Sequence, residues 1–168
     1  MPAPGALTGT LIDTGNKIQD AADNIHQLVV EHKDDLKWQN DDLIEDMIVK
    51  YDEFKVYHTP FVSIVFDTAR VEDIRINKCA QLKMDFILYY YYESLQFGND
   101  TYPYYKPLYR LMEMFVVHPY LYNFCNGTDT GIVINSNSLI GRRLDSEAFL
   151  TGQLNITVPT RICRCGHE

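Results

Sequence analysis

Apolar residues recur with helical periodicity among polar residues over the first third of the chain. Apolar side chains recur at steps of four and three, which places them on one side of a helix. This stripe consists of Ile18, Ala22, Ile25, Val29, His32 and Leu36, and it continues with Leu43 and Met47. Asp42 followed by Glu45 resembles a capping box at a new helix start. We therefore predict helices over residues 14–37 and 42–56, with a bend near Asn40.

The middle of the chain is rich in large apolar residues and has no glycine or proline between residues 61 and 97. Ile76, Ala80, Ile87 and Tyr91 keep a helical spacing, so we predict a helix over 76–97. The stretch "FVSIVF" is β-branched and "VEDIRIN" nearly alternates. A strand is therefore an alternative to the helix that we favour over 61–75.

Proline and glycine divide the remaining chain. Pro107 can open a helix, "PLYRLMEMFVV", and Pro119 should kink or restart it before the helical segment ends at Gly127. The stretches "GIVINSNSLIG" and "GQLNITVPTRICRC" are short and β-prone.

These patterns predict a mainly α protein, with four to five helices in an irregular bundle and a small C-terminal β-hairpin or three-stranded β element. We expect residues 1–10 to be a flexible N-terminal arm and 11–127 to form a helical domain. Residues 128–168 would be a β-containing extension packed on the same domain.

Four consecutive tyrosines, residues 89–92, interrupt this pattern, and Tyr109, Tyr120 and Tyr122 follow within about thirty residues. Neighbouring positions on a helix point in different directions, so one core should not accommodate all four. Tyrosine suits protein interfaces because it offers a large, rigid, amphipathic surface. An aromatic-rich core and an aromatic-lined ligand pocket are the alternatives. The residues that we predict to bind a partner are Ile18, Ile25, Val29, His32, Leu36, Leu43, Met47, Tyr89, Tyr90, Tyr92, Tyr104 and Tyr105.

Charge limits the choice of partner. The net charge is −8, and residues 1–55 carry 12 acidic and 5 basic side chains. This balance disfavours nucleic acid and anionic membrane surfaces, which need clustered lysine and arginine. No window of eighteen apolar residues is present, so we expect no membrane span. The N-terminus lacks the pattern of a signal peptide, which predicts an intracellular protein with unmodified Asn-x-Thr sequons and reduced cysteines.

The C-terminal "CRCGH" is the sharpest candidate for chemistry. Cys163, Cys165 and His167, with Cys125 as a fourth ligand, could hold a structural zinc ion. One residue between the two cysteines is closer than the usual spacing of zinc ligands. No other cofactor is predicted, and no phosphate-binding loop or Gly-x-Ser-x-Gly motif is present.

The sequence thus favours a non-enzymatic structural, assembly or adaptor protein that acts on a protein partner or as a homo-oligomer. A viral or organellar assembly component would fit this description. Two alternatives stay open: a zinc-stapled regulatory module that uses the C-terminal Cys-x-Cys-x-His, and a small cysteine-dependent enzyme.

Overall fold

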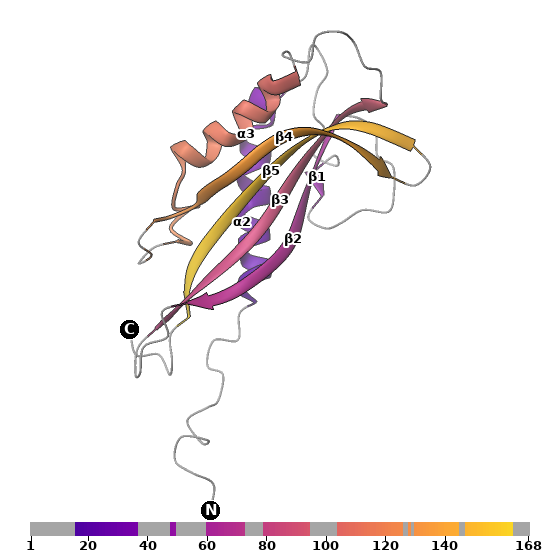
Figure 1. Cartoon of the computed structure of the whole chain (residues 1–168). Helices are drawn as coiled ribbons and strands as arrows, with labels where there is room; N and C mark the ends of the chain where they lie inside the picture. Colours follow the sequence, from indigo (N-terminus) through magenta and orange to yellow (C-terminus); the bar gives the residue numbers. More distant parts are fainter. Residues whose placement is uncertain are drawn as a thin grey trace, which may run out of the picture.

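The computed structural model describes residues 16–36, 48–49, 60–72, 79–94, 104–125, 128, 130–144 and 147–162. These residues form one five-stranded β-sheet with two α-helices packed on one of its faces (Figure 1). The elements are α2 (Lys17–Glu31), the 3₁₀-helix η1 (Lys33–Leu36), β1 (Ile48–Val49), β2 (Phe61–Glu72), β3 (Ala80–Ser94), α3 (Tyr105–Val117), β4 (Val133–Leu144) and β5 (Glu147–Ile162).

The strand order in the sheet is β1-β2-β3-β5-β4. β1 pairs with β2 in parallel, and the other three pairs are antiparallel. The central strand β3 pairs with β2 through register partners such as Val62 and Tyr90, and with β5 through partners such as Tyr90 and Gly152. The C-terminal strand therefore lies inside the sheet between β3 and β4.

The prediction of a mainly α protein was wrong, because the segments predicted as helices over 61–75 and 76–97 are the strands β2 and β3. The cause is burial on both faces of the sheet over residues 61–64 of β2 and 89–92 of β3. A strand that is buried on both faces carries a nearly continuous apolar run, which periodicity cannot distinguish from a buried helix. The β-branched and aromatic residues of these segments agree with the strand.

The first predicted helix is present but shorter than expected. α2 begins after Asn16, whose side-chain oxygen accepts hydrogen bonds from the backbone N–H groups of Ile18 and Gln19, both at 3.1 Å. This is the geometry of an N-cap. Of the second predicted helix, 42–56, the structure describes Ile48–Val49 alone, and these residues form a strand. The predicted arm, residues 1–10, lies outside the described residues.

α3 ends two residues before Pro119, as expected of a helix that meets a proline. The predicted continuation of a helix beyond Pro119 was wrong. Residues 119–125 form turns, and Leu121, Tyr122 and Asn123 have positive φ angles of 47°, 54° and 67°. This left-handed run reverses the chain towards β4, and directly before that strand the backbone N–H of Ile132 donates to the Pro119 carbonyl at 2.7 Å.

The sheet separates two apolar clusters. The larger cluster lies between the sheet and the helices, and it includes Tyr90, Tyr92, Ile25 and Leu108. The smaller cluster lies on the second face of the sheet and consists of the buried residues Phe61, Tyr89, Tyr91 and Phe149. Alternate residues of β3 point to opposite faces of the sheet, so the tyrosine run supplies both clusters.

Candidate protein-binding surface

The tyrosine run lies in the interior of a single chain. Tyr90, Tyr91 and Tyr92 have no exposed surface, and Tyr89 is 7% exposed. The Tyr90 hydroxyl donates to the Leu36 carbonyl at 2.6 Å, and the Tyr92 hydroxyl donates to the Tyr104 carbonyl. Burial raises the pKa of Tyr92 above its ordinary value. The premise that one chain cannot bury these four side chains was wrong.

The other residues predicted to bind a partner are distributed differently. Ile25, Val29 and Leu36 belong to the core beneath α2 and η1. Ile18, His32 and Tyr104 are half-buried, whereas Tyr105 is 40% exposed. Leu43 and Met47 lie outside the described residues. Among these predicted residues, Tyr105 therefore has the most exposed side chain that the structure describes.

Tyr105 belongs to an exposed apolar surface that extends along α3. Tyr109 is 59% exposed, Val116 is 67% exposed and Val117 is 63% exposed. Residues three and four positions apart are neighbours on a helix surface, so Tyr105, Tyr109, Met112 and Val116 form a continuous line. We call these four residues the α3 ridge. Tyr120 and Tyr122, in the turn after α3, are also exposed.

The opposite side of α3 is apolar as well. Pro107, Leu108, Leu111, Met114 and Phe115 are buried against the sheet and α2. The helix thus carries two apolar stripes and three charged residues. Large exposed apolar surfaces commonly mark sites of protein interaction. Figure 1 shows α3 at the outer margin of the molecule, over the β4 edge of the sheet.

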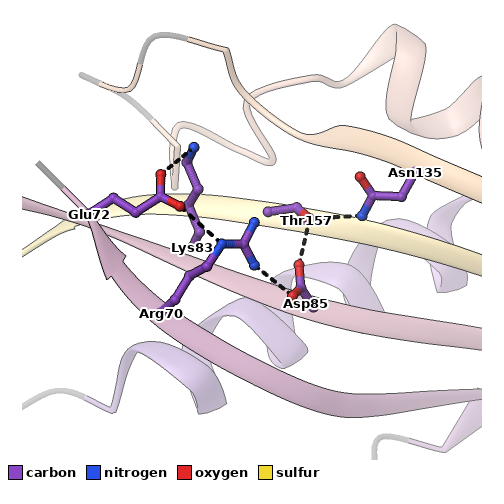
Figure 2. Close-up of polar contacts among 6 residues, drawn as sticks. All are labelled: Arg70, Glu72, Lys83, Asp85, Asn135 and Thr157. Atoms are coloured by element: carbon purple, nitrogen blue, oxygen red, sulfur yellow. Dashed lines mark hydrogen bonds and ion pairs between the residues drawn. The ribbon is translucent and has the colours of Figure 1, made fainter.

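The second face of the sheet carries a polar cluster that the sequence did not predict (Figure 2). Arg70 lies between two carboxylates, with Nε at 3.1 Å from Glu72 Oε1 and Nη1 at 2.7 Å from Asp85 Oδ2. Lys83 Nζ lies 2.7 Å from Glu72 Oε2. The two cations lower the pKa of Glu72, with Lys83 contributing most. Two positive and two negative side chains balance one another in this cluster.

Neutral side chains extend the polar cluster across β5 to the edge strand. The Thr157 hydroxyl donates to Asp85 Oδ1 at 2.6 Å, and Asn135 Nδ2 donates to Thr157 Oγ1 at 2.8 Å. A pocket of about 370 Å³ lies beside these groups. Asp85 is already held by Arg70 and Thr157. Together these contacts join the four strands β2, β3, β5 and β4. We therefore assign the cluster to the stability of the sheet.

Two histidines meet where α2 and α3 end. His32 and His118 are the C-terminal caps of these helices, and their Nε2 atoms lie 3.4 Å apart. Asp35 Oδ2 lies 3.3 Å from His32 Nδ1. Nearby, the Tyr122 hydroxyl donates to Glu31 Oε2, and this bond is the largest of the contributions that lower the pKa of Glu31. These contacts join the two helices on the side where the α3 ridge ends.

The predicted zinc site falls mostly outside the described residues, which include Cys125 but not Cys163, Cys165 or His167. No group of three or more metal-binding side chains occurs within the described ranges. Cys125 is a buried free thiol, and burial raises its pKa to about 12. A thiolate is therefore scarce at neutral pH, which disfavours Cys125 as a nucleophile.

Cys79 corrects the expectation of reduced cysteines, because it is disulfide-bonded. It lies directly before β3, and Arg161 Nη2 lies 3.4 Å from its sulfur. A bonded Cys79 cannot serve as a thiolate ligand or nucleophile while the disulfide persists.

No protein-family model and no curated protein matches the sequence. Within the described part of the chain, no helix has the length and apolar character that crossing a membrane requires. The residues that best indicate a function are therefore those of the α3 ridge. Tyr105 was predicted from the sequence. Met112 and Val116 were missed, although their spacing from Tyr105 and Tyr109 would have revealed a second apolar stripe on this helix.

Proposed function

We propose that the protein is a non-enzymatic assembly or adaptor protein that binds another protein through the outer surface of α3. The observation that carries the proposal is the exposure of Tyr105, Tyr109 and Val116 along one line of a helix whose opposite side is already packed in the core. Tyrosine and methionine are enriched at the centres of protein interfaces. The α3 ridge shares Tyr105 alone with the residues that the sequence predicted to bind a partner.

The shape of the ridge supports a protein partner over a small ligand. A ridge of four side chains on a helix is convex, whereas small-molecule sites are concave and enclose most of their ligand. A groove or a second helix on the partner can receive apolar anchors at such a spacing. The half-buried Met112, which accepts a contact from Asn137 Nδ2 on β4, extends the surface towards the edge of the sheet.

Site-specific photo-crosslinking in cells tests the proposal. A photoreactive phenylalanine analogue is placed at Tyr109 in one variant and at Gln27, on the exposed side of α2, in the control. We expect a discrete crosslinked protein from position 109 and none from position 27. Adding Val116→Ser to the first variant should reduce the yield. Equal yields at both positions, or no product at position 109, would contradict the proposal.

A further inference from the structure

We infer that the partner of the α3 ridge is a second copy of this chain, with the two α3 helices antiparallel about a two-fold axis. The inference rests on the proposed function and specifies its partner. It is carried by two features of α3: the spacing of the ridge and the positions of the charged residues beside it.

The ridge has the spacing of a helix-pairing seam. Its residues follow one another at intervals of four, three and four, which is the repeat of the a and d positions of a heptad. Tyr105 and Met112 occupy d positions, and Tyr109 and Val116 occupy a positions. The seam spans twelve residues, or about 17 Å of helix. It therefore allows two layers of contact on each side of a two-fold axis.

A two-fold axis makes an interface self-complementary, so that a contact from one copy is repeated by the other. In an antiparallel pair centred between residues 109 and 112, Tyr105 of each copy packs on the partner's Val116. Tyr109 then packs on the partner's Met112. Every large side chain of the ridge thereby gains an apolar neighbour, whereas in a single copy Tyr109 and Val116 are more than half exposed.

Charge gives the pair its orientation. Lys106 and Glu113 are seven residues apart and each directly follows a d position, so both flank the seam on the same side. Antiparallel packing brings Lys106 of one copy opposite the partner's Glu113, and symmetry repeats this ion pair. Arg110 Nη1 lies 2.6 Å from Glu113 Oε2 and holds the carboxylate on the exposed side of the helix.

The charge of the whole chain favours α3 over α2 as the meeting point. The chain carries a net charge of −8, so most surfaces of two copies repel each other. α2 holds one lysine and three acidic residues, whereas α3 holds Lys106, Arg110 and Glu113 and has a net charge of +1. Two copies that meet through α3 therefore avoid the acidic part of the surface.

A charge-swap experiment on the full chain tests the pairing, with mass measured by sedimentation equilibrium. The wild type should approach twice the chain mass of 19.5 kDa as concentration rises. Lys106→Glu and Glu113→Lys should each weaken self-association about tenfold, because each places like charges opposite one another twice. An equimolar mixture of the two variants should recover wild-type affinity, because both cross-pairs are then opposite in sign.

Asp20→Lys on α2 is the matched control, since it changes the net charge as much as Glu113→Lys does and should leave self-association unchanged. A wild type that stays monomeric at every concentration would overturn the inference. So would a mixture that is no more associated than the single variants. In either case, a crosslink from position 109 to a different protein would leave the proposed function standing.

Discussion

α2 and α3 pack on the same face of the sheet, but they present different surfaces to solvent. The exposed side of α2 carries polar residues such as Asp20, Gln27 and Glu31, and its apolar residues are buried in the core or, like Ile18, half-buried against it. The exposed side of α3 carries Tyr109 and Val116. α2 is thus an ordinary amphipathic helix with a polar side facing solvent, whereas α3 has a second apolar stripe that a single chain does not cover.

The two helices also differ in how their N-terminal ends are stabilised. Asn16 caps the start of α2 with its side chain, whereas the cap residue of α3, Tyr104, makes no side-chain capping bond. α2 therefore has local stabilisation of its own, and α3 depends more on packing. This contrast indicates that substitutions in α2 and its core should act on folding, and that those on the α3 ridge should act on binding.

The largest expected effect separates a tyrosine in the core from a tyrosine on the ridge. Tyr90→Ala should lower the free energy of unfolding by about 3–5 kcal/mol, because it leaves a cavity and removes the hydroxyl that bonds to Leu36. Tyr109→Ala should change the stability of the dissociated chain by less than about 0.5 kcal/mol. Urea denaturation at low protein concentration measures both. Equal losses would show that the ridge is part of the folding core.

A smaller effect is expected at the start of α2. Asn16→Ala should cost about 1 kcal/mol of stability, because the backbone N–H groups of Ile18 and Gln19 lose their acceptor. Asn16→Ser should retain most of the stability. Thermal unfolding followed by circular dichroism compares the two variants. If alanine and serine prove equivalent at this position, the capping bond is not what stabilises α2.

The smallest effect concerns the polar contact between α2 and the turn after α3. Tyr122 holds the pKa of Glu31 below 4.5, so the contact stabilises the fold above that pH and is lost as pH falls through the lowered pKa. Tyr122→Phe should raise the pKa of Glu31 towards 4.5 and reduce the pH dependence of stability in this range. Carboxyl titration by NMR provides the measurement, and an unchanged Glu31 pKa would exclude the contact in solution.

The sequence predicted some parts of the fold for sound physical reasons. α2 is amphipathic, so one apolar stripe among polar residues was enough to identify it. Pro107 lies in the first turn of α3, which begins two residues earlier at Tyr105, and Pro119 follows its end, although no helix restarts there. β2 and β3 could not be identified, because residues 61–64 and 89–92 are buried on both faces of the sheet and their strand partners lie far away in the sequence. Tyr90 and Tyr91 look alike in the sequence and belong to different clusters.

The candidate surface was predictable only in part. Tyr105 was selected because tyrosine is common in interfaces, but the same reasoning also selected Tyr89, Tyr90 and Tyr92, which are buried in the single chain. Residue type alone does not tell a buried ring from an exposed one. The informative signal was the charge-poor circumference of α3, which has too many apolar residues for one core.

We expect the outer side of α3 to be covered in the working protein and that of α2 to stay exposed. Val116→Cys and Gln27→Cys place one small thiol on each helix, and peptide mass spectrometry measures maleimide labelling of each at increasing protein concentration. The buried Cys125 serves as an internal unreactive thiol. Labelling at position 116 should slow as the protein concentration rises, whereas labelling at position 27 should stay fast. Equal, concentration-independent labelling at both positions would contradict it.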